Sequence, residues 1–187
     1  IIAEAKNGLR GSKIIFPSIS VGATENAILA SFKAEGKTTL INCAIEPEIM
    51  DLIKFLNKLG GNIEIVGRKI IINKARELNK NIKHEIIFDR IEAGTYMIAA
   101  ALIGKKIILN NVSPKIIKTE LSVLKKMGVR IKTLKSKIEI FKSDKIKKIS
   151  IVTKPYPGFP TDLQAQLMVL MTRANGISKI KENSFEN

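Results

Sequence analysis

The residues with the clearest chemical potential lie in a proline-rich segment at residues 155–166, which reads PYPGFPTDLQAQ. Its prolines fix φ and remove backbone donors, so the segment is predicted to be a shaped loop rather than an interior strand. It delivers one carboxylate, Asp162, to the first turn of an apolar helix. A carboxylate held there could serve acid–base chemistry or simply cap the helix, and the local spacing leaves both alternatives open.

Two other apolar helices are predicted to begin with polar residues. Ser20-Val21-Gly22-Ala23-Thr24 precedes one of them, and the segment from Asp89 to Thr95 precedes the other. If the three helices are related by approximate symmetry, their N-termini lie at one end of the structure, where free amides and the helix dipole favour phosphate. Gly22 would let a ligand oxygen approach the backbone closely. For each of these helices, the alternative to phosphate binding is that the polar residues only cap the N-terminus.

An internal repeat organises the elements that must position these residues. The segment GKTTLIN at 36–42 matches GKKIILN at 104–110, and the downstream words EPEI at 46–49 and SPKI at 113–116 also correspond. Each unit is predicted to contain a strand, a helix, a strand, a second helix and a β-hairpin. Superposed units should align Gly36 with Gly104 and Gly60 with Gly128, and two matched units support each other.

The helices of the repeat differ in pattern. Those predicted at 25–33 and 93–102 are apolar or small nearly all round, which indicates burial on every side. Those at 48–59 and 115–126 are amphipathic, begin near a proline, end at a glycine and should be less buried. A hairpin is predicted from strands at 62–66 and 69–73, and a further apolar helix at 163–173.

These elements predict an α/β fold (α+β in some schemes) with four parts. Residues 1–12 end a preceding unit, 13–79 and 80–146 are complete units, and 147–187 are a truncated third unit that carries the proline-rich loop. The chain therefore resembles a slice of a longer protein, because a unit that cannot bury its faces is not a natural terminus.

The composition excludes several classes. The 187 residues include 45% hydrophobic residues and carry a net charge of +15, which suggests an anionic partner. Nucleic acid is disfavoured because aromatic residues are scarce and the lysines are dispersed. No apolar run is long enough to span a membrane and no secretory signal is present, so a soluble cytoplasmic protein is expected.

The single cysteine and single histidine argue against a disulfide and a protein-built metal site, so no metal is expected. Cys43 is predicted to be a buried core thiol. His84 is predicted to precede a strand, has no carboxylate partner in a recognisable motif and is interpreted as a surface or satisfied histidine.

Five colinear motifs across essentially the whole chain closely resemble the UDP-N-acetylglucosamine enolpyruvyl transferases, which belong to the EPSP synthase-like family. The motifs are FPSISVGATEN at 16–26, EPEI at 46–49, DRIEAGT at 89–95, YPGFPTDLQAQ at 156–166 and FEN at 185–187. The resemblance implies an inside-out α/β barrel of repeated βαβαββ units in two lobes that close over substrate. The lobe crossing would fall within residues 76–88.

The family transfers the enolpyruvyl group of phosphoenolpyruvate to the 3-hydroxyl of UDP-N-acetylglucosamine, releases phosphate and so begins peptidoglycan synthesis. The resemblance implies that Asp162 is the catalytic carboxylate that takes the proton of this hydroxyl. It assigns Asp89 and Arg90 to lobe closure. The implied substrate-binding residues are Ser18, Ile19, Ser20, Val21, Gly22, Thr161, Asp162 and Ser184.

The resemblance also sets limits. The family's proton-donating cysteine and its cationic residues for phosphoenolpyruvate match no residue of this chain, so the chain alone is expected to be inactive. The expected partners are the two substrates, with no cofactor, no nucleic acid and no membrane, in a monomer. The alternative hypothesis is a non-catalytic basic module that binds nucleic acid or other polyanions.

Overall fold

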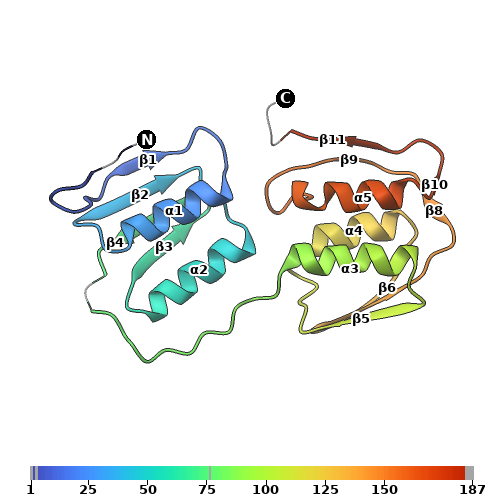
Figure 1. The fold of residues 1–187 in the computed structure, drawn as a ribbon, viewed down its shortest axis with the longest axis horizontal. Helices are drawn as coiled ribbons and strands as arrows, with labels where there is room; N and C mark the ends of the chain where they lie inside the picture. The colour runs from blue at the N-terminus through green and yellow to red at the C-terminus, as the bar shows by residue number, and fades with distance from the viewer. Residues whose placement is uncertain (1, 3, 76, 184–187) are drawn as a thin grey trace. The chain divides into compact units, whose positions relative to one another are not determined.

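The computed structural model describes residues 2, 4–75 and 77–183 (Figure 1). The chain divides into two compact units, Ile1–Ile87 and Phe88–Asn187. The boundary between them lies within residues 76–88, whereas the finer division at residues 12, 79 and 146 stays a prediction.

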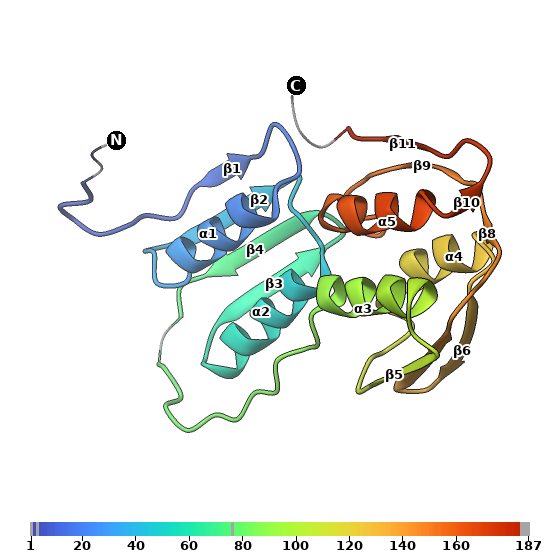
Figure 2. The ribbon, with the colours of Figure 1, turned by 45° about the vertical axis from the view of Figure 1, so that its right-hand side comes forward.

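Unit 1 is one mixed sheet with two helices on the same face (Figures 1 and 2). The sheet has the order β1-β2-β4-β3, with β1 parallel to β2 and β4 antiparallel to both of its neighbours. Both helices contribute to one core with the inward residues of the strands, such as Leu40, Ile70 and Ile72. In chain order the elements are β1 (Lys13–Ile15), α1 (Val21–Ser31), β2 (Lys37–Ile41), α2 (Pro47–Lys58), β3 (Asn62–Val66) and β4 (Lys69–Asn73).

Unit 2 begins with a helix and an antiparallel sheet of order β5-β7-β6. Its first elements are α3 (Arg90–Leu102), β5 (Lys106–Asn110), α4 (Lys118–Lys126), β6 (Arg130–Leu134) and β7 (Lys137–Phe141). The sheet covers one side of α3, and the inward side chains of β7, Ile138 and Ile140, are completely buried in the core of the unit.

The rest of unit 2 adds a second layer that carries the proline-rich loop. α5 lies beside α3, on the side away from β5 (Figure 2). This layer also contains two short parallel strand pairs, β8 with β10 and β9 with β11. Its elements are β8 (Ile146–Lys147), β9 (Ser150–Val152), the 3₁₀ turn η1 (Thr161–Leu163), α5 (Gln164–Met171), β10 (Ala174–Asn175) and β11 (Lys179–Lys181).

The predicted element order is confirmed in unit 1 and incomplete in unit 2. Unit 1 has the order βαβαββ. Between residues 77 and 89 the structure has no strand, so the strand predicted after His84 is wrong. The equivalent strand of unit 1, β1, pairs with β2, whereas β5 pairs only with β7 among the described residues. An extended segment without a partner does not become a strand.

The repeat is real, but the sequence alignment of its second strand is displaced by one residue. β2 starts directly after Gly36, whereas β5 starts two residues after Gly104. The residues directly after β2 and β5 are Asn42 and Asn111, which both have a left-handed backbone, with φ of 63° and 58°. The pairing of Gly36 with Gly104 is therefore wrong, because the adjacent Lys105 and Lys106 at the start of β5 hid the extra residue.

The pairing of Gly60 with Gly128 is supported by the structure. Each glycine directly follows the residue that ends an amphipathic helix, and each has a positive φ, 105° and 89°. Each lies two residues before the first strand of a hairpin. Only glycine adopts this conformation without strain, which explains why the two positions match in sequence.

The predicted helices exist, but several begin elsewhere than expected. α1 and α3 begin earlier than predicted because Ser20 and Asp89 cap them. α4 begins at Lys118, three residues later than predicted, since a turn occupies residues 114–117. Hydrophobic periodicity locates the middle of a helix better than its ends, which capping determines.

The prediction of burial is confirmed for α3 and wrong for α1. In α3, seven of 13 residues are buried, against four of nine in α4. In α1 only three of 11 are buried, against four of 12 in α2, and Leu29 is 54% exposed. α3 has the sheet on one side and α5 on the other, whereas only one side of α1 is covered by described residues of unit 1. The sequence pattern shows that the side chains of a helix are apolar, but it does not show which elements pack against them.

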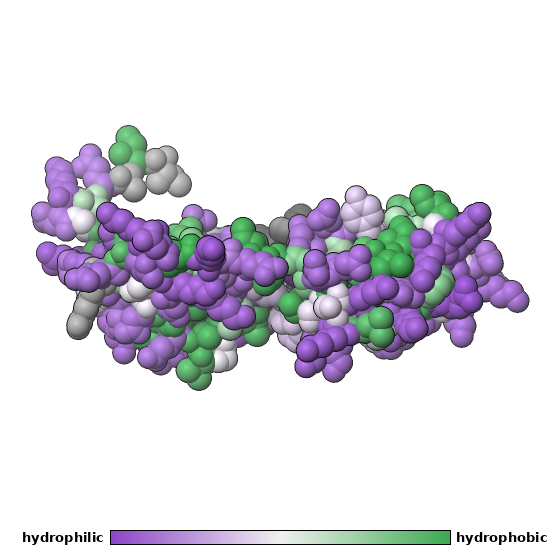
Figure 3. Space-filling view, turned by 90° about the horizontal axis from the view of Figure 1, so that it is seen from below, coloured by the Kyte–Doolittle hydropathy of each residue, from purple (hydrophilic) through white to green (hydrophobic). Residues whose placement is uncertain are grey.

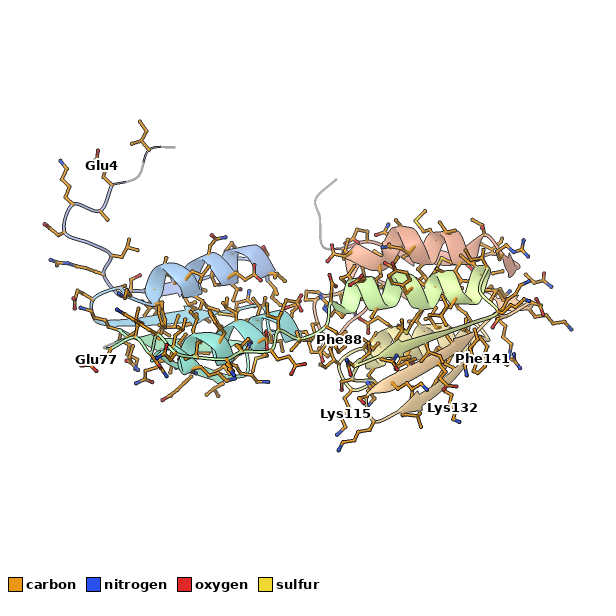
Figure 4. All side chains as sticks on the ribbon, turned by 60° about the horizontal axis from the view of Figure 1, so that its bottom comes forward. Glu4, Glu77, Phe88, Lys115, Lys132 and Phe141 are labelled. Atoms are coloured by element: carbon orange, nitrogen blue, oxygen red, sulfur yellow. The ribbon has the colours of Figure 1, made fainter. Side chains whose placement is uncertain are left out.

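The outer face of the unit 2 sheet is basic. Glu139 on β7 accepts ion pairs from Lys106 and Lys137, both at 3.0 Å, and these lysines lower the pKa of its carboxyl group. The charged groups of Lys106 and Arg130 also lie 5.3 and 5.2 Å from the ring centre of Phe141, which is labelled in Figure 4. These contacts stabilise the sheet because they join side chains of β5 and β6 to Phe141 on the central strand β7.

Charge is unevenly distributed along the chain. The first 87 residues hold 13 Lys and Arg and nine Asp and Glu, for a net charge of +4, and the remaining 100 residues account for the other +11. Hydrophilic side chains dominate the face seen in Figure 3, with apolar residues scattered between them. None of the described helices has the length and apolar character needed to cross a membrane.

Candidate functional site

The proline-rich loop that leads to Asp162 is held by its own backbone. Lys154 N donates to Phe159 O at 2.9 Å, and Gly158 N donates to Pro155 O at 2.8 Å. A Cβ atom on Gly158 would lie only 2.9 Å from the carbonyl oxygens of both Lys154 and Pro155. Phe159 is 4% exposed. The loop is therefore a closed, anchored structure that fixes where the following turn begins.

Asp162 lies in the 3₁₀ turn η1, directly before the buried Leu163. Leu163 is 1% exposed, and its amide donates to Pro160 O at 3.2 Å. Asp162 itself is exposed, and its carboxylate accepts no hydrogen bond or ion pair within the described part of the chain. The cap residues are Pro160 for η1 and Leu163 for α5, so the interpretation of Asp162 as a helix cap is wrong.

The predicted residues at the start of α3 have local partners in unit 2. Oδ1 of Asp89 accepts hydrogen bonds from Ile91 N at 2.7 Å and Glu92 N at 3.1 Å, so Asp89 caps α3. Arg90 Nη1 lies 3.8 Å from Glu120 Oε1, and both side chains are more than nine-tenths buried. Asp89 thus caps α3, and Arg90 joins the first turn of α3 to α4. Their role in lobe closure stays a prediction.

The residues predicted to bind the nucleotide form the turn that leads into α1. Oγ of Ser20 accepts from Ala23 N at 3.2 Å, and its carbonyl accepts from Thr24. The amides of Val21 and Gly22 donate to no described residue. A methyl group added at Gly22 would meet no atom within 4 Å. Two free amides and open space at a helix N-terminus suit an anionic oxygen. Ser18 and Ile19 precede them in the same turn.

Two residues that were not among the predicted site residues hold this turn in place. Asn42, in its left-handed conformation, donates from Nδ2 to Phe16 O at 3.0 Å. Thr24 is completely buried, and its Oγ1 donates to Ser20 O at 2.7 Å and accepts from Ala44 N at 3.0 Å. Asparagine after a strand is a known signal for this backbone conformation, and it occurs in both repeats.

Cys43 is a core residue, as predicted. Its side chain is 0% exposed, and burial raises the pKa of the thiol, with a smaller opposing effect from the Ile70 backbone and Arg68. Only the thiolate is strongly nucleophilic, so a raised pKa leaves less of the reactive form at neutral pH. Cys43 therefore has neither the access nor the ionisation of a catalytic cysteine.

We expect Cys43 in the folded chain to react at least about tenfold more slowly with dithionitrobenzoate at pH 8 than in the chain unfolded by guanidinium. The reason is its complete burial together with its raised pKa. Because it is the sole cysteine, the absorbance of the released thiolate reports on it alone. Equal rates in the folded and unfolded chain would show that the thiol is accessible.

His84 has a carboxylate partner that the sequence did not indicate. Its Nε2 lies 3.0 Å from Asp51 Oδ2 on α2, and the two side chains are 9% and 13% exposed. The ring of Phe55 packs edge-on against it, with centroids 5.4 Å apart. The interpretation of His84 as a surface or satisfied histidine is therefore confirmed only for Nε2, because Nδ1 is buried and has no hydrogen-bond partner in the described part of the chain. The Nε2 contact ties the connecting segment to α2.

The structure brings the predicted residues together in two groups, one in each unit. Unit 1 holds the turn before α1. In unit 2, α3 and α5 start at the same end (Figure 1), so the Asp89 cap and the Asp162 turn lie in one region. Ser184 and the FEN motif lie outside the described residues. No cluster of three His, Cys, Asp or Glu residues suited to a metal occurs in the part of the chain that the structure describes.

Solved structures with a similar fold are enolpyruvyl transferases. The enolpyruvyl transferase NikO from Streptomyces tendae is similar with a TM-score of 0.75 and 24% identity, over 86% of this chain and 39% of that one. EPSP synthase from Acinetobacter baumannii is similar with a TM-score of 0.61 and 21% identity, over 92% of this chain and 40% of that one. They confirm the predicted α/β class and show the fold alone.

The family follows from the sequence itself. The EPSP synthase (3-phosphoshikimate 1-carboxyvinyltransferase) family profile matches residues 1–187, so the chain belongs to this family. A UDP-N-acetylglucosamine 1-carboxyvinyltransferase from Pelagibacter ubique is 52% identical over 185 residues, which are 99% of this chain and 44% of that protein. One of the same name from Halothermothrix orenii is 48% identical over 187 residues, or 100% of this chain and 45% of that protein. The chain thus spans less than half the length of these relatives.

Proposed function

We propose that this chain supplies the sugar-nucleotide turn and the general base of an enzyme that transfers the enolpyruvyl group of phosphoenolpyruvate to the 3-hydroxyl of UDP-N-acetylglucosamine. The observation that carries the proposal is the Asp162 carboxylate. It is exposed and without a partner in the described chain, although Leu163, the residue directly after it, is 1% exposed. The relatives' names support the same reaction.

In this reaction Asp162 takes the proton of the sugar hydroxyl. The hydroxyl oxygen bonds to the carbon of phosphoenolpyruvate that carries the phosphate, while an acid supplied by the rest of the enzyme protonates the neighbouring methylene carbon. Loss of a proton from that carbon then restores the double bond as the bond to the phosphate oxygen breaks. The released phosphate accounts for the proton, so no cofactor or redox step is required. An exposed carboxylate on an anchored turn is suited to this role, because its position changes little when the proton arrives.

The turn before α1 is assigned to the diphosphate. The free amides of Val21 and Gly22 would donate to its oxygens, and the positive end of α1 would favour its charge. Ser18, Ile19 and Ser20 would contact the nucleotide in the same turn. Thr161 and Ser184 complete the proposed substrate contacts, and the product would enter peptidoglycan synthesis in the cytoplasm.

We expect Gly22→Ala to weaken binding of UDP-N-acetylglucosamine to the 187-residue chain by about tenfold or more, measured by isothermal titration calorimetry. The added methyl meets nothing in the protein, so it can obstruct only a ligand oxygen at the Gly22 amide. Stability should stay unchanged or rise by up to about 1 kcal/mol, since alanine favours helix.

The control for this variant is Ala27→Gly, which lies on α1 but away from its first turn and tests the effect of helix propensity. Gly67→Ala is not a suitable control, because φ at Gly67 is positive.

The polyanion-binding alternative gains no support from the relatives. It predicts affinity that falls steeply with salt and ignores Gly22. Unchanged affinity of Gly22→Ala for the sugar nucleotide would contradict the assignment of the turn.

A further inference from the structure

The most specific contact between distant parts of unit 2 lies behind the Asp162 turn. Gly94, in the interior of α3, faces Leu163, the residue directly after Asp162. A Cβ atom on Gly94 would lie 3.0 Å from Leu163 Cδ2 and 3.3 Å from its Cγ, and closer still to Cδ1. Leu163 is 1% exposed, and its side chain belongs to the core of the unit. The space that glycine leaves on α3 is therefore filled by Leu163.

A glycine in this place carries a local cost. Inside a helix, glycine is about 1 kcal/mol less favourable than alanine. The backbone of Gly94 has no positive φ that would require glycine. The close approach of η1 is thus the feature of the structure that explains the residue, because only a helix surface without a side chain lets the turn reach this depth.

A second contact fixes the same two elements one residue further along. Gln166 Nε2 on α5 donates to Thr95 Oγ1 on α3 at 3.0 Å. The Thr95 hydroxyl donates in turn to Ile91 O at 2.8 Å, so its oxygen is oriented to accept from Gln166. The side-chain amide and the glycine contact together hold both ends of the first turn that follows Asp162.

We infer that Gly94 and Thr95 are positioning residues for Asp162: they form a seat on α3 that sets the depth and orientation of the turn carrying the carboxylate. We call this pair, with its partners Leu163 and Gln166, the α3 seat. The inference rests on the proposed function in one respect, the catalytic role of Asp162. Its geometric part stands on the contacts alone.

The mechanism of the effect is direct. Asp162 and Leu163 share a peptide bond, so a displacement of Leu163 by a methyl group on Gly94 moves the carboxylate as well. General-base catalysis requires the base to lie within hydrogen-bond distance of the proton it accepts. A misplacement of about 1 Å can cost on the order of a hundredfold in rate. Binding of the substrate elsewhere would be little affected.

The first test measures the geometry in the 187-residue chain by NMR. Gly94→Ala is expected to shift the amide signals of Asp162 and Leu163 and the carboxyl carbon of Asp162. The double variant Gly94→Ala/Leu163→Val, which removes the atoms that clash, should return these signals toward those of the unaltered chain. Gly22→Ala, the same change at a helical glycine in unit 1, is the control and should leave them unchanged.

The second contact supplies an independent pair of variants in case Gly94→Ala fails to fold. Thr95→Val removes the hydroxyl and should shift the Asp162 signals, whereas Thr95→Ser keeps it and should not. A structural role without positioning would lower stability in these variants but leave the Asp162 signals of the folded protein in place. Unchanged Asp162 signals in both Gly94→Ala and Thr95→Val would overturn the inference.

The kinetic test uses a chimeric enzyme in which this chain replaces the aligned residues of the Pelagibacter ubique relative. Gly94→Ala should lower kcat by about tenfold or more, with KM for UDP-N-acetylglucosamine within about twofold, and Leu163→Val should rescue it. A normal kcat in Gly94→Ala overturns the positioning role. If Asp162→Asn also has normal kcat while the NMR shifts are present, the proposed function fails and the seat itself is retained.

Discussion

Asp162→Asn in the chimeric enzyme is expected to lower kcat by roughly two to four orders of magnitude, the usual effect of removing a general base. The amide has nearly the same shape as the carboxylate but cannot accept the proton of the sugar hydroxyl. Steady-state kinetics measured by phosphate release would give the effect. KM should change much less, because the lost interaction acts on proton transfer rather than on binding.

The thermal stability of the same variant separates catalysis from structure. Asp162 accepts no hydrogen bond from the described residues, so Asp162→Asn should leave the melting temperature within about 1 °C of the parent. Asp89→Asn is the matched control, since Asp89 does cap a helix and asparagine caps about as well as aspartate. Full turnover by Asp162→Asn would refute the general-base assignment.

The 187-residue chain alone is expected to release no measurable phosphate from phosphoenolpyruvate and UDP-N-acetylglucosamine. Its sole cysteine is buried and cannot donate a proton to substrate. Loss of a general acid costs about two to four orders of magnitude, and loss of a cationic phosphate clamp adds further orders. The measurement is a coupled phosphate assay at micromolar enzyme.

Binding provides the control for that negative result. A chain that binds the sugar nucleotide in calorimetry yet releases no phosphate is folded and lacks only the remaining catalytic groups. The chimeric enzyme, assayed under the same conditions, should be active. Turnover by the chain alone, at a rate proportional to its concentration, would contradict the expectation and require an acid among its own residues.

The local features of the fold were predictable because short-range chemistry determines them. Glycines with positive φ mark the ends of α2 and α4, and alternating residues mark the hairpins. The one-residue displacement before β5 was not predictable, because the adjacent Lys105 and Lys106 fit the pattern equally well in either alignment. The backbone conformation shared by Asn42 and Asn111, which the sequence does not display, resolves it.

The contacts that hold the site could not be predicted, since they join residues far apart in the chain. Nothing in the words DRIEAGT and PTDLQAQ indicates that Gly94 receives Leu163 or that Thr95 receives Gln166. The sequence likewise shows that α1 is apolar but not that Leu29 is exposed. A resemblance between motifs identifies which residues belong to a site, and only packing shows which of them support the others.

The hydrogen bonds of Asn42 and Thr24 have a thermodynamic consequence for ligand binding. They hold the turn before α1 in its shape in the absence of ligand. Ordering a flexible residue on binding costs about 1 to 2 kcal/mol of conformational entropy. A turn that is already ordered avoids this cost for each of its residues, so the free energy of contact with an anion is available almost entirely as affinity.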